Sequence, residues 1–472
     1  MDRTVTVTTG APTRVAPAVA TAAMAPRTRL LLEGAIVPTL LRLAAPNVAV
    51  MMIQAVLTTA DAFWVGRLGP DALAGVSLVF PIVMLMQTMS AGGMGGGVAS
   101  AVARALGGGR RADATALVLH ATVIALVMGA LFTALILGFG PRAYHAMGGR
   151  DGALAAALTY SNVVFAGAVA PWLYNTLGSV VRGTGNMSVP AIVMAISAAV
   201  QLVLTPALVL GWFGAPRLGI AGAGVSTVTA FSLGSALLVG YLRWGGSLVR
   251  LELRGVRLRL TFFADILRVG APGALNTIQT NLTIVLLTGL VGPFGMLALA
   301  GYGMGARLEY LQIPLVFGFG SALVAMVGTN VGAGRLARAE RVAWVGAALA
   351  AGVTTAIGVT GALAPRLWLG LFTADPTVIA AGSQYLRIVG PFYGFFGLGL
   401  ALYFASQGAG RLLWPLISGF FRLTVAAVGG YVVTRMFGLG LPALFAVMSL
   451  ALVCFGTTTT VAVRSGAWRA GR

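Results

Sequence analysis

One acidic residue, Asp61, lies deep inside the first long apolar segment of the chain, residues 45–64. Four polar residues of this segment fall within about 60° of one another on a helical wheel: Asn47, Gln54, Thr58 and Asp61. A carboxylate in hydrocarbon costs at least about 2.5–3.5 kcal/mol, so such a residue is by default a candidate functional site. The rise from Pro46 to Asp61 is about 22 Å of a roughly 30 Å hydrocarbon core, which leaves snorkelling towards water as the alternative.

Acidic residues are scarce in the apolar parts of the chain, because only Asp61 and Glu309 of the 11 lie within apolar spans. A desolvated aspartate can exchange a proton and an ionised one can hold a cation, so ion chemistry is concentrated on these two positions. For Glu309, a possible second acid, charge compensation by Arg307 or another nearby arginine is favoured over direct coupling. The other acids fall in predicted tails, loops or span ends: Asp2, Glu33, Asp71, Asp113, Asp151, Glu252, Asp265, Glu340 and Asp375.

Composition places the chain in a membrane. Its 472 residues are 58% hydrophobic and 9% charged, with a mean hydropathy of +0.93, whereas a soluble domain carries about 25% charged residues. Apolar runs recur from end to end, and the alternating pattern of a membrane β-barrel is missing. We therefore predict an all-α polytopic membrane protein with twelve spans, near residues 42–65, 72–105, 113–139, 151–182, 187–212, 217–244, 261–291, 295–331, 339–371, 377–407, 412–436 and 440–464.

The basic residues set the expected orientation. All 31 are Arg, and they gather in alternate loops together with both termini, which predicts that the termini lie on the cytoplasmic side of a cell membrane. The same distribution argues against nucleic-acid binding as the reason for the net charge of +20. Membrane lipid is therefore the expected partner. Nothing in the sequence demands an oligomer, so a monomer is expected.

The residue patterns of soluble enzymes are missing. His120 and His145 are not spaced as a metal site, and one cysteine, Cys454, cannot form a zinc centre or an intramolecular disulfide. The glycine clusters at 92–97 and 107–109 lack the Lys-Ser/Thr of a phosphate-binding loop. We expect no catalytic residues, no metal and no organic cofactor. Without a nucleotide-binding loop, a pump of this kind would take its energy from an ion gradient, with H⁺ or Na⁺ as the coupling ion.

The chain repeats itself at an offset of 225 or 226 residues. Six spans per half give both halves the same orientation, so we predict two parallel six-helix lobes around a central cavity. The partner of the Asp61 helix, residues 272–288, has Leu287 at the equivalent position and keeps polar residues but no carboxylate. The predicted divisions are a disordered cytoplasmic tail (1–36), an N-lobe (37–244), a cytoplasmic linker (245–260), a C-lobe (261–464) and a cytoplasmic tail (465–472).

Several short motifs follow one another in a recognisable order: RLAAP at 42–46, DAFWVGRLGPDALA at 61–74, RALGGGR at 104–110, RGTG at 182–185, RLE at 307–309 and GTNVGAGR at 328–335. With twelve spans and a parallel repeat, this order resembles the multidrug and toxic compound extrusion (MATE) family, and within it the DinF-like branch. The resemblance covers roughly residues 37–460. It implies an ion-driven antiporter that exports amphipathic, often cationic drugs by alternating access and so contributes to antibiotic resistance.

The resemblance also implies a role for Asp61, which matches the coupling acid of the family's first helix. Its protonation or cation binding would alternate with drug binding, with bending of that helix at Pro46. Asn47, Gln54 and Thr58 share its face. Substrate contacts are expected from aromatic and polar residues of both lobes: Trp64, Tyr174, Asn175, Asn276, Thr280 and Tyr393.

The chain departs from the family's pattern in its fifth span. Thr205 stands where many DinF-like members have a second acid, so Gln201 and Thr205 can hydrogen-bond to Asp61 but cannot share its charge. The C-lobe acids of the NorM branch have no counterpart near Thr280 and Phe396, which favours a one-acid proton mechanism over Na⁺ coupling. Two alternatives stay open. The first is a flippase for lipids or lipid-linked saccharides, which is expected to have more arginine within the membrane than this chain has. The second is a degenerate membrane protein that does not transport.

Overall fold

The computed structural model describes residues 24–466 and 468, except 253–254 and 256. Its first half contains α1 (Pro26–Glu33), α2 (Ile36–Gly66), α3 (Pro70–Thr88), the π-helix η1 (Met89–Met94), α4 (Gly95–Gly107), α5 (Arg111–Ala146), α6 (Asp151–Ala166), α7 (Val169–Gly183), α8 (Ser188–Leu210), η2 (Trp212–Gly214) and α9 (Ile220–Trp244). Its second half contains α10 (Leu260–Val291), η3 (Gly292–Phe294), α11 (Met296–Gly332), α12 (Leu336–Leu363), α13 (Pro365–Leu369), α14 (Pro376–Val389), η4 (Gly390–Phe392), α15 (Tyr393–Ala409), α16 (Leu413–Thr424), η5 (Val425–Gly429), η6 (Val432–Met436) and α17 (Leu441–Arg464).

These helices confirm the predicted class of an all-α polytopic membrane protein. Among the described residues, 11 helices are long and apolar enough to cross a membrane, and the bent pair α6–α7 brings the total to 12. The pair is bent by 48° at its break, three residues before Pro171. The glycine cluster at 92–97 begins in η1, whereas Pro81, Pro206 and Pro314 lie inside α-helices that continue past them.

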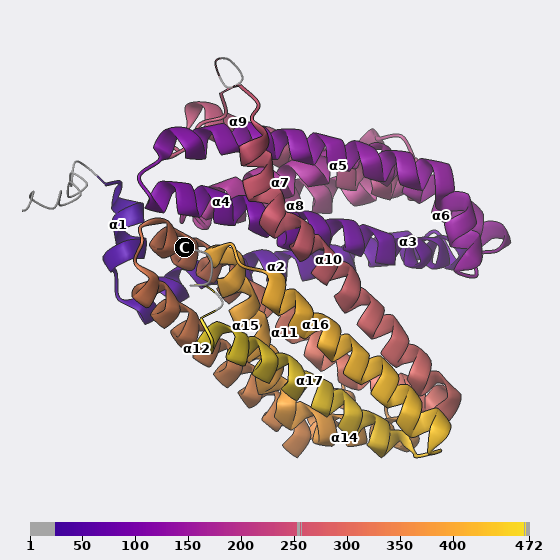
Figure 1. Cartoon of the computed structure of the whole chain (residues 1–472). Helices are drawn as coiled ribbons and strands as arrows, with labels where there is room; N and C mark the ends of the chain where they lie inside the picture. Colours follow the sequence, from indigo (N-terminus) through magenta and orange to yellow (C-terminus); the bar gives the residue numbers. More distant parts are fainter. Residues whose placement is uncertain (1–23, 253–254, 256, 467, 469–472) are drawn as a thin grey trace, which may run out of the picture.

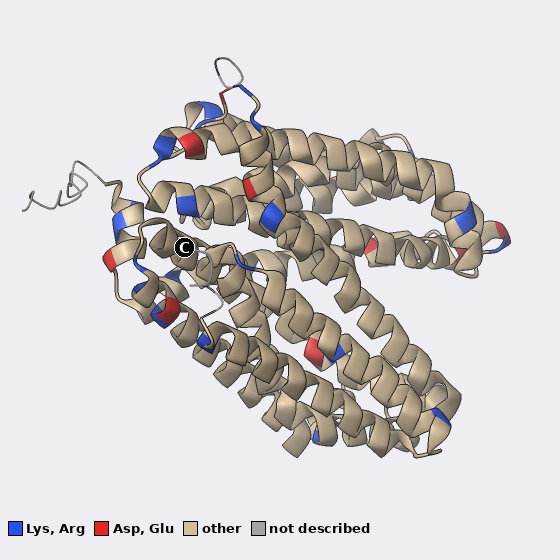
Figure 2. Cartoon of the chain, in the orientation of Figure 1, with Lys and Arg blue, Asp and Glu red and all other residues tan. Residues whose placement is uncertain are grey.

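The two halves form two groups of helices that converge at one end and spread apart towards the other (Figure 1). Helix α1 and the described end of the chain lie at the converging end, which also carries most of the arginine (Figure 2). Helix α2 packs against both α8 of its own half and α11 of the other half. Because α2 packs on helices of both groups, a change in the conformation of α2 would alter the packing between the lobes.

The prediction of a disordered tail through residue 36 is wrong for residues 26–33, which form α1. Leu31 and Leu32 are 2% and 1% exposed, and Leu31 packs in a core cluster made mostly of residues from the second half of the chain. Asn330 donates to the Leu31 carbonyl at 3.0 Å, and Arg335 donates to the Leu32 carbonyl at 3.2 Å. Residues 1–23 of the predicted tail lie outside the described residues.

The link between the halves is partly packed rather than wholly solvated. Val249 and Leu251 are 0% and 7% exposed, and Arg111 donates to the Leu248 carbonyl at 2.9 Å. The backbone N–H of Arg259 donates to Nε2 of the buried His120 at 2.9 Å. The predicted linker, residues 245–260, is therefore anchored to α5 at two places, and residues 253–254 and 256 lie outside the described part.

The two halves meet through a reciprocal backbone contact between α4 and α11. A Cβ on Gly107 would overlap the Thr329 carbonyl oxygen, and a Cβ on Gly332 would overlap the Arg104 carbonyl oxygen. Both pairs of positions differ by 225 residues, the offset of the sequence repeat. The contact is therefore related by the pseudo-twofold axis of the parallel repeat, and only glycine permits so close an approach.

Gly107→Val tests this contact. The added side chain has no room at α11, so we expect it to destabilise the converged lobes by about 1–3 kcal/mol, the usual cost of overpacking. Thermal unfolding together with spin-label distances across the converging end measures the effect. Gly352→Val is the matched control, because nothing lies within 4 Å of a Cβ at that position of α12. Equal behaviour of the two variants would contradict the tight contact.

Candidate functional site

Asp61 lies in the second-last turn of α2, five residues before Gly66, and faces α8. Gln201 Nε2 donates to its Oδ2 at 2.8 Å, and the Thr205 hydroxyl donates to its Oδ1 at 3.2 Å. Gln201 and Thr205 are one helical turn apart on α8, so their side chains point to the same side. Asp61 is absent from the ion pairs within the described residues, so its two oxygens are held by neutral donors.

Helix α9 supports the two donors from behind. The Ser226 hydroxyl lies 2.8 Å from that of Thr205, and Gln201 Nε2 also donates to the Thr227 hydroxyl at 3.3 Å. Ser226 and Thr205 are 0% and 1% exposed, so these contacts form where water cannot replace them. The chain of hydroxyls and amide fixes both donors on Asp61 and gives a hydrogen-bonded network that spans α2, α8 and α9.

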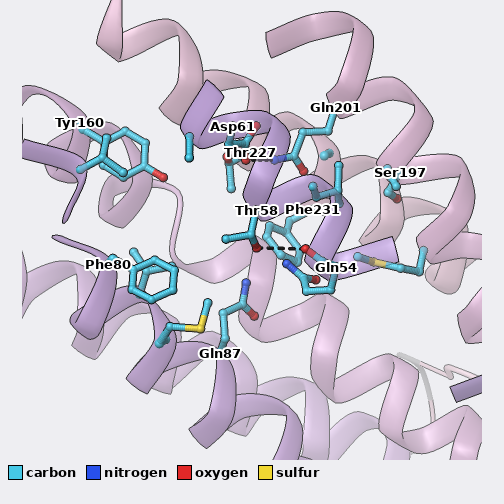
Figure 3. A pocket seen from close by; sticks show the side chains of 18 of the residues that line it. Gln54, Thr58, Asp61, Phe80, Gln87, Tyr160, Ser197, Gln201, Thr227 and Phe231 are labelled. Carbon is cyan, nitrogen blue, oxygen red and sulfur yellow. Dashed lines mark hydrogen bonds between the residues drawn. The ribbon is translucent and has the colours of Figure 1, made fainter. Parts of the chain in front are cut away.

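Asp61 lines a cavity of about 290 Å³ within the first half of the chain. Figure 3 shows Asp61, Gln201 and Thr227 close together on one side, with Phe80, Tyr160 and Phe231 around the same space. The remaining lining residues are apolar or neutral polar, and none of the cavity's lining residues is basic. An acid surrounded by aromatic rings and apolar walls suits an amphipathic molecule that carries a positive charge.

The structure brings part of the predicted ion-coupling group together. Gln54 and Thr58 line the same cavity as Asp61, and the Thr58 hydroxyl donates to the Gln54 carbonyl at 2.9 Å. Asn47 does not line it. Its amide donates to the Leu43 carbonyl at 3.2 Å, and its side chain is 5% exposed near the contact between α2 and the second half.

The predicted substrate residues are spread over the molecule. Tyr174 lines the cavity, and Asn175 lies one contact away, since its amide donates to Oε1 of the lining residue Gln87 at 2.8 Å. The other four lie outside the cavity. Trp64 packs against Trp212 with ring centroids 5.1 Å apart. Asn276 and Thr280 lie on α10, and Tyr393 is 0% exposed in the core of the second half. Their contact with substrate stays a prediction.

Sequence reasoning missed several members of the site, chiefly Tyr160 on α6 and Ser226 and Thr227 on α9. Ser226 and Thr227 are adjacent polar residues in an apolar span, and that signal could have selected them. Tyr160 is the repeat partner of Tyr385, 225 residues later in the chain. The two tyrosines do serve comparable places, because Tyr160 lines the cavity of Asp61 and Tyr385 donates to Glu309 at 2.9 Å.

The other in-membrane acid, Glu309, has a basic partner. Arg422 of α16 lies 3.6 Å from Glu309 Oε1, and the two side chains are 13% and 15% exposed. The same guanidinium lies over the rings of Phe396 and Phe455, at 5.2 and 5.6 Å from their centroids. Arg307 instead lies over Phe372 at 5.3 Å. The charge of Glu309 is thus compensated by Arg422 and not by Arg307, so the two acids stand in opposite electrostatic surroundings.

Comparisons with known proteins point to one family. The family model MatE matches the chain twice, over residues 46–207 and 272–432, which is the register of the internal repeat. The probable multidrug resistance protein NorM of Deinococcus radiodurans is 31% identical over 424 residues, covering 85% of this chain and 89% of that protein. A protein named FAD transporter from Shewanella oneidensis is 26% identical, covering 85% and 90%.

Solved structures show the same fold. A MOP superfamily transporter from Pyrococcus furiosus superposes with a TM-score of 0.87 at 23% identity, over 94% of this chain and 98% of that one. The outward-facing conformation of a multidrug resistance MATE family transporter gives a TM-score of 0.84 at 23% identity, over the same shares. These matches confirm two lobes of parallel six-helix repeats.

Gln201→Met tests the network around Asp61. The substitution keeps the volume and removes the amide donor, so we expect a loss of about 1.5–3 kcal/mol in the free energy of unfolding. Combining it with Asp61→Asn should shrink that loss, because the carboxylate it serves is gone. Gln54→Met is the control, since Gln54 lines the same cavity without a side-chain hydrogen bond among those of the described residues. If the losses in the free energy of unfolding from Gln201→Met and Asp61→Asn simply add in the double variant, the network is contradicted.

Arg422→Met tests the charge pair of the second half. Removing one member of a buried pair costs about 3–5 kcal/mol, whereas removing both is close to neutral. Thermal unfolding should therefore show a large loss for the single variant and recovery when Glu309→Gln is added. Arg307→Met serves as the control for loss of a nearby guanidinium. No recovery in the double variant would mean that Arg422 does not compensate Glu309.

Proposed function

The chain belongs to the MatE family of multi-pass membrane transporters, and we propose that it exports amphipathic cations in exchange for protons, with Asp61 as the coupling acid. The observation that carries the proposal is the isolation of Asp61, an acid in a largely apolar cavity with neutral donors and no basic lining residue. It is a transporter and not an enzyme. We propose that it needs no metal or organic cofactor, only the coupling ion.

The exchange follows from the two charge states of one carboxylate. Ionised Asp61 accepts hydrogen bonds from Gln201 and Thr205 and attracts a cation into the cavity. Protonated Asp61 has no charge, so the attraction is lost and the drug leaves. Proton and cation thus compete for one group. Alternating access turns that competition into transport, because each ligand is then released on the side where its binding is weaker.

The proposed orientation rests on the arginine distribution. The converging end carries most of the arginine and is therefore assigned to the cytoplasm, together with both termini (Figure 2). The lobes then spread towards the outside, as in the outward-facing relative (Figure 1). In this state Asp61 would receive a proton from outside and release the drug there. The plasma membrane is the expected location, and the chain is proposed to act as a monomer.

Protons are favoured over Na⁺ by the donors on Asp61. An amide and a hydroxyl donate to its two oxygens, whereas a bound cation wants oxygen acceptors around it. The position of a second acid is held by Thr205, so the site has one carboxylate to offer. One carboxylate with neutral donors changes charge by taking up a proton without any further ligand.

The charge of the cavity also bears on the substrate. The relative named FAD transporter implies a large anionic molecule, and the NorM relatives imply multidrug export. An anion in this cavity would face Asp61 with no basic lining residue to bind it, so the multidrug type is favoured. The same observation disfavours a flippase of lipid-linked saccharides. Among the arginines within the spanning helices, Arg422 pairs with Glu309, and Arg307 and Arg387 do not line the cavity.

Uptake of a cationic dye into everted vesicles tests the proposal. An imposed pH gradient, acid inside, should drive uptake by the wild type, and Asp61→Asn should reduce it about 5–150-fold, the ordinary size of a coupling free energy. Asp113→Asn is the control, since Asp113 is an acid that pairs with Arg110 outside the cavity. Full uptake by Asp61→Asn would show that Asp61 is not the coupling acid. Uptake driven by a Na⁺ gradient alone would contradict proton coupling.

A further inference from the structure

A second cavity, separate from the Asp61 site, lies where the two halves converge. Its volume is about 400 Å³, and three arginines from both halves line it: Arg104 of α4, Arg268 of α10 and Arg411 after α15. We propose that this cavity binds the phosphate group of an anionic ligand, either a phospholipid headgroup or free phosphate, and that the bound phosphate clamps the two lobes together at this end.

The charge balance of the cavity leaves room for an anion. Its one carboxylate, Asp265, accepts from Arg104 Nη2 at 2.6 Å. Arg268 and Arg411 have no carboxylate partner among the ion pairs of the described residues. Three guanidinium groups therefore face one carboxylate, and the excess positive charge matches a phosphate. Planar guanidinium groups bind phosphate oxygens in a bidentate way, and basic pockets between membrane helices on the cytoplasmic side hold lipid headgroups.

Arg104 is held in place for this role. Its side chain is 13% exposed, and besides Asp265 it contacts the Ser100 hydroxyl. Ser100 in turn donates to the Gln407 carbonyl at 2.5 Å and the Gly408 carbonyl at 3.0 Å, so the network joins α4 to α15 across the lobes. A preorganised guanidinium loses less conformational entropy on binding than a free one.

The apolar wall of the same cavity fits a phosphate that carries an organic group. Val331, Leu336, Ala409 and Trp468 complete the lining, and the Trp468 indole donates to the Ser406 hydroxyl at 3.2 Å. Gly410 lies at the base with a φ of +76°, and a Cβ there would lie 2.9 Å from Arg104 Nη1. Glycine at this position therefore keeps the guanidinium accessible from the cavity.

The site occurs once, although the chain repeats. The repeat partner of Arg104 is Thr329, and that of Arg411 is Asn186. The position that the pseudo-twofold axis relates to this cavity therefore lacks two of the three cations. Helix α1 lies on that other side, where Asn330 donates to the Leu31 carbonyl. The segment of α10 that carries Arg268 packs against α4, the helix of Arg104, whereas Arg411 follows α15 of the other lobe. A phosphate bound to all three would have to lose contacts when α4 and α15 separate.

Thermal unfolding of the full-length protein tests the proposal with two probes, inorganic phosphate in detergent and phosphatidylglycerol against phosphatidylcholine in nanodiscs. We expect the anionic probe to stabilise the wild type, and Arg268→Gln/Arg411→Gln to weaken that response about tenfold or more. Arg42→Gln/Arg341→Gln is the matched control, because both residues are exposed and neither lines the cavity. Arg268→Lys/Arg411→Lys keeps the charge and should weaken the response less, which guards against a folding defect of the glutamine pair.

The outcomes separate the sources and the site. A response to inorganic phosphate that phosphatidylglycerol does not exceed identifies free phosphate as the ligand, and a response to phosphatidylglycerol alone identifies the headgroup. If the site variant and the control variant lose the same amount of stabilisation by the probe, the response comes from general surface charge and the site is overturned. A wild type that responds to neither probe would overturn it as well. The proposal stands apart from proton coupling, so Asp61→Asn should respond to the anion like the wild type.

Discussion

An ionisable acid inside a membrane protein must be neutralised, paired or given hydrogen-bond donors, and this requirement organises both lobes. The first lobe gives Asp61 two neutral donors on α8, and α9 fixes those donors in turn. The second lobe gives Glu309 a guanidinium and a phenol. The two lobes share one fold and differ in the partner of their buried acid, a guanidinium for Glu309 and neutral donors for Asp61. This difference supports the proposed coupling at Asp61.

In the proposed transport cycle, the two lobes must both stay together and come apart. Backbone contact at Gly107 and Gly332 depends on shape alone and is related by the pseudo-twofold axis. The arginine cavity beside it breaks that symmetry, because Arg104 has Thr329 as its partner in the repeat. Each dispersion contact in such packing has a small energy, so an anion that bridges the lobes would add a further interaction that must be broken when they separate.

Much of this could be predicted from the sequence, for identifiable reasons. The length of the apolar segments predicted the helices, and the constant offset between repeated residues predicted the parallel repeat. The lone acid Asp61, with Gln201 and Thr205 expected nearby, predicted the centre of the candidate site. The sequence could not place Tyr393, because an aromatic residue in a span packs in a core or faces a cavity with the same local pattern. It also missed α1, whose order comes from backbone contacts to Asn330 and Arg335, about 300 residues away.

The central claim is that proton and cation exclude each other at Asp61. Proton release tests it most directly: a cationic dye is added to the purified protein in weakly buffered detergent, at a pH where efflux is active. Dye binding should release protons from the wild type and none from Asp61→Asn, because linkage requires the competing ligand to leave. Dye binding by the wild type without proton release across the active pH range would contradict it.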